Sequence, residues 1–141
     1  LEKNAFVELA LPAGVLRTLD DEEMAEYRRP FAHMGEGRRP TLTWPRQLPI
    51  DGEPPEVVEI VKRFGAWLAR VEIPKLFVNG EPGLILTGRA RDFCRTWPAQ
   101  AEVTVPGTHY LQEDSPDLIG AAISDWLDAV RGSRTGDAGG G

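Results

Sequence analysis

Two strand-like runs, separated by one helical run, limit what this chain can fold into. Residues 74–79 form a short apolar run, and residues 101–105 alternate between apolar and polar side chains. Between them, Thr87 is placed to cap a helix that Pro98 ends. A strand, a helix and a strand form one parallel crossover unit, and two strands are too few for an independently stable sheet. The chain is therefore predicted to be of the α/β class and to complete a larger parallel sheet whose other strands lie elsewhere.

Further helical runs carry more apolar surface than two strands can cover. Helices are expected over residues 5–10, 20–30, 55–68 and 115–130. Asn4 is placed to cap the first, which Leu11 and Pro12 are expected to end. The apolar face of the helix that opens at Pro55 is interpreted as core packing. The Gly-rich residues 132–141 are predicted to form a disordered tail.

The charge balance excludes several classes of partner. The net charge is -6, and no cluster of Lys and Arg is larger than a pair, so neither nucleic acid nor an anionic membrane is expected to bind. The single cysteine, Cys94, excludes an internal disulfide and favours a cytoplasmic location. The chain opens on Leu1 without the form of a signal peptide, and we interpret this start as the later part of a longer polypeptide.

Residues 105–114 contain the histidine with the most informative position. A strand-like run stops at a Pro-Gly pair, His109 follows, and a helix start lies directly behind it. In an open parallel sheet, ligands bind at the carboxyl ends of the strands, where this turn and the turn over residues 79–85 lie. We therefore expect His109 to be the general base of a hydrolytic site. A structural histidine is the alternative.

Four motifs occur in one order along the chain: WPRQLPI at residues 44–50, KLFVNGEPG at 75–83, RDFCRTWP at 91–98 and HYLQEDSPDLIG at 109–120. Together they resemble the haloalkane dehalogenases of the α/β-hydrolase fold, in particular the broad-specificity subfamily whose triad acid precedes the cap. The resemblance covers the C-terminal portion of a family member. It implies part of a helical cap and a connecting helix over residues 1–70, and the last two parallel strands with their flanking helices over residues 71–131.

The resemblance implies that His109 is the histidine of a catalytic triad. In that family an aspartate attacks the carbon that bears the halogen, and halide leaves as an alkyl ester forms. The histidine then activates water to hydrolyse the ester, without a metal or an organic cofactor. The nucleophilic aspartate, the triad acid and the paired Trp and Asn halide donors are expected on an upstream half, on the same or a separate chain. Alone, this chain is expected to be inactive.

The resemblance also implies a set of substrate-binding residues: Gly14, Trp44, Pro45, Leu48, Leu84, Ile85 and Tyr110. Those at 44, 45 and 48 match the cap segment above the halide pocket, and those at 84 and 85 match the wall after the penultimate strand. Tyr110 lies beside the base. Gly14 matches a tunnel-mouth position that a larger side chain often fills, which implies a wider entrance. Without the resemblance, ordinary lid packing explains each of them.

Three acidic residues near these turns have structural alternatives to catalysis. Glu81 follows the penultimate strand, where many α/β-hydrolases hold the triad acid, so it is either that acid or a turn residue. Glu113 and Asp114 precede a helix start, and capping together with the helix dipole explains both.

Several functions stay open at this point. The first is hydrolysis of small halogenated hydrocarbons, with release of halide ion. Epoxide hydrolysis and a luciferase-type oxidation are the enzymatic alternatives on the same scaffold. A non-catalytic complementing or binding fragment is the alternative from a different class, because the chain contains a base without a nucleophile.

Overall fold

The computed structural model describes residues 2–137 and divides the chain into two compact units, Leu1–Leu68 and Ala69–Gly141. The division falls close to the boundary expected after residue 70. Within residues 2–137, none of the helices combines the length and the hydropathy that a membrane-spanning segment requires.

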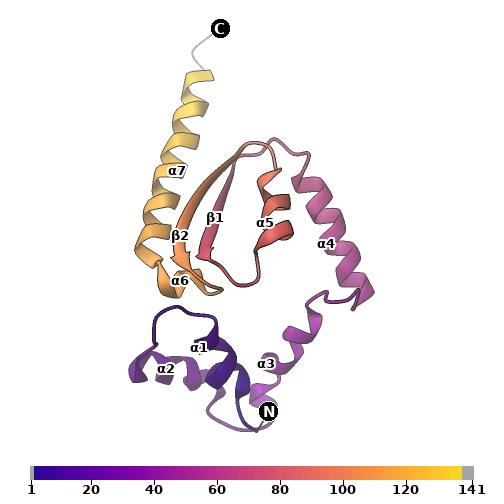
Figure 1. The fold of residues 1–141 in the computed structure, drawn as a ribbon, viewed down its shortest axis with the longest axis vertical. Helices are drawn as coiled ribbons and strands as arrows, with labels where there is room; N and C mark the ends of the chain where they lie inside the picture. Colours follow the sequence, from indigo (N-terminus) through magenta and orange to yellow (C-terminus); the bar gives the residue numbers. More distant parts are fainter. Residues whose placement is uncertain (1, 138–141) are drawn as a thin grey trace. The chain divides into compact units, whose positions relative to one another are not determined.

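The described part of the first unit consists of helical segments and their connections, with one isolated antiparallel bridge between Ile50 and Glu53. Its elements are a π-helical turn at Phe6–Ala10, α1 (Leu11–Ala13), α2 (Asp21–Arg28), 3-10 turns at Arg29–Phe31, Glu36–Arg38 and Pro45–Gln47, α3 (Pro40–Thr43) and α4 (Pro55–Leu68) (Figure 1). A small core lies under the first three helical segments and consists of Val7, Leu11, Val15, Leu19 and Met24. Val7, Leu11 and Met24 come from helical segments, whereas Val15 and Leu19 come from the connection between α1 and α2, so burial of these side chains holds the segments together.

The start of this unit differs from the sequence prediction. Asn4 adopts a positive φ of 48°, and its carbonyl accepts the N–H groups of Val7 and Glu8, whereas its side chain does not cap the helix. The helix does not end at Leu11 and Pro12 but continues as α1. Pro12 is tolerated because it lies in the first turn of α1, directly after a π-helical turn, where its missing N–H removes no regular helical bond.

Helix α2 begins as its sequence predicts. The Asp20 carboxylate accepts the Glu23 N–H at 2.8 Å, and the Glu23 carboxylate accepts the Asp20 N–H at 2.9 Å, which forms a reciprocal capping box. Arg17 also pairs with Glu23 at 2.6 Å. The hydrogen bond from Arg17 is the main reason that the pKa of Glu23 is lowered to about 2. The acidic start of α2 is therefore satisfied by local partners.

Helix α4 has the predicted start but not the predicted burial. Its apolar side chains Ile60, Val61 and Phe64 are exposed, with Phe64 58% accessible, so the face is not packed into a core of the described residues. Phe64 stacks on Trp67, with ring centroids 5.8 Å apart. The interpretation of this face as core packing is wrong for the chain by itself, because no described segment covers it.

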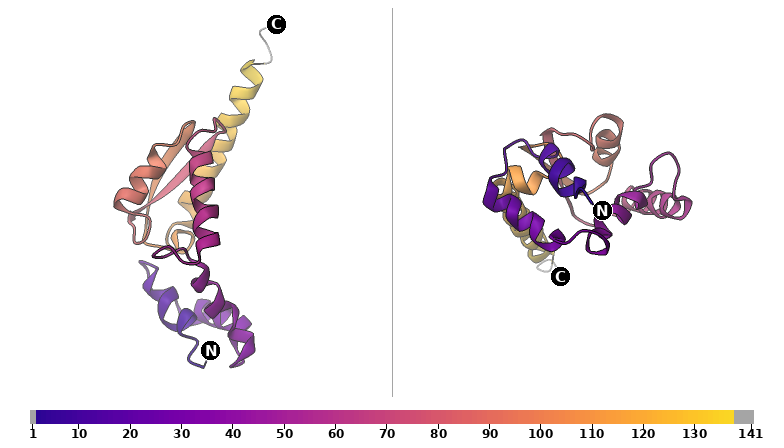
Figure 2. Two further views of the ribbon diagram at one scale, coloured as in Figure 1. Left: turned by 90° about the vertical axis from the view of Figure 1, so that its right-hand side faces the viewer. Right: turned by 90° about the horizontal axis from the view of Figure 1, so that it is seen from below.

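The second unit is a single parallel crossover. Strands β1 (Lys75–Pro82) and β2 (Gln100–Gly107) pair in parallel register from Lys75 with Gln100 to Pro82 with Gly107, and α5 (Gly88–Arg95) connects them. Helices α6 (Leu111–Asp114) and α7 (Pro116–Asp137) follow β2. Helices α5 and α7 lie on opposite faces of the two strands (Figures 1 and 2). The predicted strand, helix and strand are therefore confirmed.

Two boundaries in this unit differ from the prediction. Strand β1 continues through Gly80 and Glu81 to Pro82, where a turn was expected, because the ladder with β2 extends to the Pro82 and Gly107 pair. Pro82 is tolerated at the end of the strand, where no further ladder bond is needed from it.

Helix α7 continues to Asp137, so residues 132–137 are helical where the sequence predicts a disordered tail. Helical propensity is low at Gly132, yet a single glycine costs only about 1 kcal/mol in a long helix. Residues 138–141 lie outside the described part.

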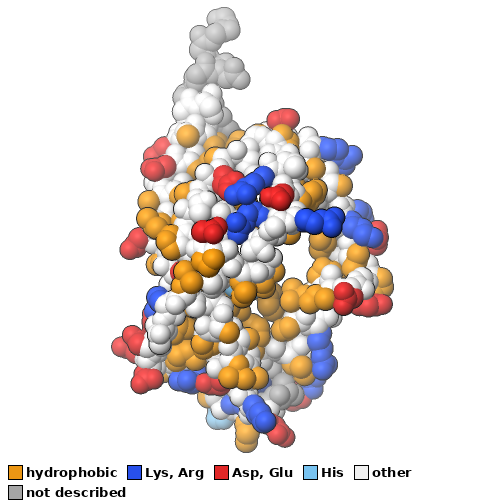
Figure 3. Space-filling view, viewed as in Figure 1, with side chains coloured by type: hydrophobic (Ala, Val, Ile, Leu, Met, Phe, Trp, Pro, Cys, Tyr) orange, Lys and Arg blue, Asp and Glu red, His pale blue; other side chains and the backbone are white. Residues whose placement is uncertain are grey.

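Most hydrophobic side chains in the described part of the second unit are at least partly exposed to solvent. Among its described residues, Val105 is the one hydrophobic residue of the buried core, at 1% exposure, whereas the large apolar side chains of α5 and α7 include exposed ones such as Phe93, Leu118 and Ile123. Hydrophobic side chains are visible across the face drawn in Figure 3. Parallel sheets are usually covered on both faces, so this pattern is typical of a sheet with missing neighbours.

Candidate functional site

His109 lies in a short turn between β2 and α6 that is tethered on both sides. The Ser115 hydroxyl, which is buried, donates to the Pro106 carbonyl at 2.7 Å, and the Asp114 carboxylate accepts the Thr108 N–H at 3.4 Å. The His109 side chain itself is exposed within this chain. These tethers fix the backbone around the histidine and leave its ring accessible.

Tyr110 lies directly against the histidine. The two ring centroids are 4.6 Å apart, with the ring planes tilted by 55°. Partial burial raises the pKa of the Tyr110 hydroxyl above its ordinary value, because the charged phenolate would lose solvation. Tyr110 therefore stays protonated near neutral pH and presents a neutral ring edge beside His109.

The turn after β1 reaches the same end of the sheet. The Gly83 N–H donates to the Gly107 carbonyl at 2.9 Å, which joins the ends of the two strands, and the Thr87 N–H donates to the Ile85 carbonyl at 3.0 Å. Gly83 has a φ of +74°, a conformation that side chains disfavour. The carboxyl ends of β1 and β2 are therefore joined through backbone contacts.

The two turns enclose a pocket of about 200 Å³. Its lining consists of Val78, Gly80, Gly83, Ile85, Leu86, Thr108, His109 and Leu111. The lining is mostly apolar, and the His109 imidazole is its only ionisable side chain. The pocket lies at the carboxyl ends of parallel strands, where ligands bind in open α/β sheets. This geometry suits a small apolar molecule placed next to a proton acceptor.

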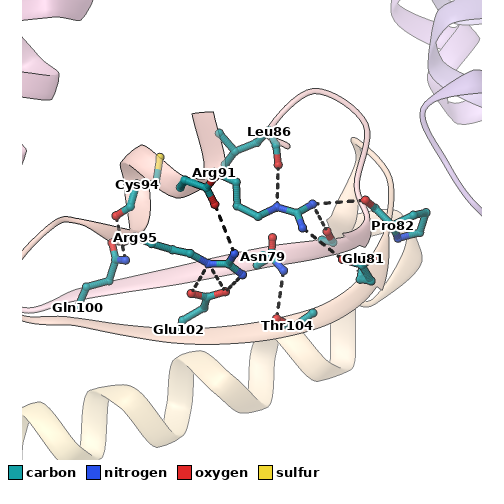
Figure 4. A network of polar contacts seen from close by, with 12 residues as sticks. Asn79, Glu81, Pro82, Leu86, Arg91, Cys94, Arg95, Gln100, Glu102 and Thr104 are labelled. Atoms are coloured by element: carbon teal, nitrogen blue, oxygen red, sulfur yellow. Dashed lines mark hydrogen bonds and ion pairs between the residues drawn. The ribbon is translucent and has the colours of Figure 1, made fainter. Parts of the chain in front are cut away.

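A polar network lies on the α5 side of the strands (Figure 4). Arg91 donates to Glu81 and to several backbone carbonyls of the β1–α5 turn, whereas Arg95 pairs with Glu102 at 2.7 Å. The hydrogen bond from Arg95 lowers the pKa of the Glu102 carboxyl. Asn79 donates to the Thr104 hydroxyl at 3.1 Å. Within residues 2–137, no three His, Cys, Asp or Glu side chains are grouped so that they could hold a metal ion.

The structure brings together part of the expected site. His109 and Ile85 line one pocket, and Tyr110 contacts the His109 ring. Leu84 is exposed and is not among the residues that line this pocket. Glu81 lies in the last residues of β1 and not in a turn, and its exposed carboxylate pairs with Arg91 at 3.3 Å. In the described part of the chain, no hydrogen bond or ion pair joins it to His109.

Four of the expected residues belong to the first unit. Gly14 is buried directly after α1, and Pro45 opens a 3-10 turn. Trp44 is exposed and makes an edge-to-face contact with Phe6, with centroids 6.4 Å apart. Leu48 is exposed as well. Their assignment to a substrate pocket stays a prediction.

Sequence reasoning missed several residues that form the pocket. Gly80 and Leu111 contact each other, since a Cβ added at Gly80 would lie 2.5 Å from the Leu111 side chain. Leu86 and Thr108 complete the wall. The pairing of Gly80 with Val105 at the strand ends could have indicated that Gly80 lies in the pocket. That pairing is known only from the structure, in which β1 extends to Pro82. Arg91 begins the RDFCRTWP motif at 91–98, but no spacing in the sequence links it to the turn after β1.

Comparisons with known proteins agree with this geometry. No family model matches the chain. A haloalkane dehalogenase of Sphingobium indicum is 57% identical over 131 residues, which are 93% of this chain and 44% of the relative. The coelenterazine h 2-monooxygenase of Renilla reniformis is 41% identical over 132 residues, which are 92% of this chain and 42% of that protein. The crystal structure of haloalkane dehalogenase DbeA from Bradyrhizobium elkani USDA94 superposes with a TM-score of 0.85 and 44% identity, covering 93% of this chain and 45% of that one.

These similarities confirm the resemblance drawn from the four motifs. The chain is homologous to haloalkane dehalogenases along nearly all of its length, and its fold is the corresponding part of an α/β-hydrolase. It spans somewhat less than half the length of the curated relatives it matches, as their C-terminal part.

Proposed function

We propose that this chain forms part of a haloalkane dehalogenase and supplies its histidine base and one wall of its substrate pocket. The observation that carries the proposal is His109 in an apolar pocket, in a chain that is 57% identical to a dehalogenase over 93% of its length. The substrates are small halogenated hydrocarbons, and the products are an alcohol and a halide ion.

The chemistry divides into two displacements. A carboxylate of an aspartate outside these residues attacks the halogen-bearing carbon, so that a carbon–oxygen bond forms and the carbon–halogen bond breaks. His109 then takes a proton from a water molecule, whose oxygen attacks the ester carbonyl. The proton passes to the departing alkoxide, which leaves as the alcohol, and the carboxylate is restored. An apolar pocket strengthens the hydrogen bonds that hold the leaving halide.

The remaining site residues are proposed from the same family pattern. Ile85 and Leu84 form the wall after β1, Tyr110 shields the base, and the cap residues Trp44, Pro45 and Leu48 roof the pocket. Gly14 leaves the entrance wide because it has no side chain. The presence of Ile85 and His109 in one pocket supports the wall assignment.

The proposed partner of these residues is an upstream half with the nucleophilic aspartate, the triad acid and the Trp and Asn halide donors. The exposed apolar faces of α4 and α7 support this, as does the length of the relatives. With a single cysteine, the protein is proposed to act in the cytoplasm.

The test uses an assembled enzyme, in which the N-terminal part of the Sphingobium indicum dehalogenase that this chain does not cover precedes residues 1–141. It is expected to release halide continuously from a brominated alkane. His109→Phe is expected to give a single burst of about one halide per enzyme molecule, with the alkyl ester retained on the protein and visible as a mass increase. His33→Phe is the matched control and should turn over normally. A folded assembled enzyme that releases no halide refutes the proposal.

Oxidation of coelenterazine is the second candidate, because the Renilla relative is named for that reaction and is 41% identical. The same assembled enzyme, incubated with coelenterazine and oxygen, decides between the two. Light emission without halide release would favour the oxidation. Halide release without light favours the dehalogenase.

A further inference from the structure

Arg91 ties the whole β1–α5 turn to helix α5. Its Nη2 donates to the Gly80 carbonyl at 3.2 Å and the Pro82 carbonyl at 3.3 Å, and its Nε donates to the Leu86 carbonyl at 3.3 Å. Its Nη1 pairs with Glu81 at 3.3 Å. Each contact is long, but together they span both ends of the turn. The Arg91 side chain is only 14% exposed, so water competes weakly for these donors (Figure 4).

The turn is shaped to receive this guanidinium. A Cβ at Gly83 would lie 2.7 Å from Arg91 Nη2, and the φ of +74° is disfavoured for any other residue. The absence of a side chain at Gly83 therefore gives Arg91 room to approach the carbonyls. A planar guanidinium can address several acceptors at once, whereas a lysine ammonium acts as a point charge.

The turn held in this way is a wall of the pocket beside His109. Gly83, Ile85 and Leu86 line that pocket, and Ile85 is 65% exposed, so its position depends on the backbone rather than on packing. Arg91 is not itself among the lining residues. We infer that Arg91 is a positioning residue that holds the pocket wall and thereby sets how tightly the apolar part of the substrate is bound. This inference rests on the proposed dehalogenase function.

Arg95 provides a matched control on the same helix. It also pairs with a carboxylate of the sheet, Glu102, and Figure 4 shows it beside Arg91. Its hydrogen bonds go to that carboxylate and to none of the carbonyls of the turn. Arg95→Met therefore removes a comparable ion pair while the pocket wall stays held.

The experiment compares Arg91→Met, Arg91→Lys and Arg95→Met in the assembled enzyme. Halide release from bromoalkanes of increasing length gives kcat and KM, and amide hydrogen exchange reports on residues 83–87. Arg91→Met is expected to raise KM about tenfold for short substrates, with a smaller change in kcat and an unchanged pH profile, because Arg91 contacts no reacting group. In Arg91→Met, the Gly83 and Thr87 amide hydrogens should exchange faster than in the parent assembled enzyme. Arg91→Lys should recover part of both effects.

Two results overturn the inference. The first is an Arg91→Met variant whose KM and whose amide hydrogen exchange at residues 83–87 equal those of Arg95→Met. The second is a loss of kcat with an altered pH profile and unchanged exchange, which would make Arg91 a partner of a catalytic Glu81. If the parent assembled enzyme releases no halide, the proposed function fails, and unchanged exchange at residues 83–87 in Arg91→Met still refutes the positioning role. If Arg91→Met does not fold, the same measurements on Arg91→Lys decide.

Discussion

At the scale of single residues, one buried hydroxyl fixes the turn that presents the histidine. Ser115 donates to the Pro106 carbonyl at 2.7 Å, across the bend that contains His109. The hydrogen bond is part-buried, so removal of the hydroxyl leaves the Pro106 carbonyl without this donor where water has limited access, which costs more than the bond itself contributes. Ser115 therefore matters to the site although it lies outside the pocket lining.

Ser115→Ala is expected to lower the free energy of unfolding of the assembled enzyme by about 1–3 kcal/mol, because the Pro106 carbonyl loses its donor. Denaturant titration measures this change. Ser133→Ala is the control, since the exposed Ser133 hydroxyl donates to a carbonyl of its own helix, that of Val130. Equal stability of the two variants would contradict the tether.

A second residue-scale prediction concerns Gly83. The alanine in Gly83→Ala would have a disfavoured φ, and its Cβ would clash with Arg91 Nη2. The substitution is expected to lower the free energy of unfolding by about 1–3 kcal/mol and to raise KM. Gly120→Ala is the control, because nothing lies within 4 Å of its added Cβ. In the interior of α7 this change should stabilise by about 0.5–1 kcal/mol. Thermal unfolding of both variants gives the comparison, and a neutral Gly83→Ala would show that the turn is not constrained.

At this scale the sequence predicted His109 but not its surroundings. The Pro-Gly pair before it and the helix start behind it are local signals, so its place at a strand end could be predicted. Asp114 was explained by the helix dipole, whereas the structure shows its carboxylate accepting the Thr108 N–H. Such a contact depends on how the chain folds back over six residues, which no spacing rule specifies.

At the scale of elements, helix starts were predicted better than ends. Asp20 and Pro55 precede or open helices as expected, because caps and proline act within one turn. Strand β1 extends past its predicted end because its ladder partner β2 continues, and that pairing is not local. Asn4 does not act as a side-chain cap, because it has a positive φ of 48° and its side chain makes no capping hydrogen bond.

The capping box of α2 gives a prediction with a defined pH range. The pKa of Glu23 is lowered from 4.5 to about 2 in the folded state, mainly by Arg17. A depressed carboxyl pKa contributes stability that is present above pH 4.5 and is lost as the pH falls toward 2. Unfolding of the assembled enzyme should therefore become easier over this interval, and Glu23→Gln should reduce the slope. An unchanged slope in Glu23→Gln would contradict the role of Glu23.

At the scale of the whole molecule, the dominant feature is apolar surface that no described segment covers. Phe64 is exposed on α4 of the first unit, and Phe93 and Leu118 are exposed on the helices that flank the two strands of the second unit. The sequence predicted this excess of apolar surface, because two strand-like runs are too few to cover the apolar faces of several helical runs. That comparison does not require knowledge of the tertiary structure. It did not indicate which faces would stay open, because α4 could equally have packed on residues of the chain itself.

Residues 1–141 alone are expected to self-associate and to unfold without a cooperative transition, because exposed apolar faces of this extent are poorly tolerated in water. Co-expression with the N-terminal part of the Sphingobium indicum relative should give a stable complex of the two pieces with a sharp thermal transition. Analytical ultracentrifugation and calorimetry test both statements. Phe64→Glu, on the open face of α4, should weaken the complex, whereas Arg63→Glu, at the neighbouring exposed position, should leave it intact. A monomeric chain with its own cooperative transition would contradict the prediction.

The lining of the histidine pocket comes from one continuous stretch, from Val78 to Leu111. The histidine, the pocket wall and Arg91 therefore lie in one segment of the chain. A single genetic recombination on each side of this stretch would exchange all of them at once without separating Arg91 from the turn it supports. Exchange of this segment with the corresponding segment of a relative is therefore expected to transfer the pocket lining as one unit.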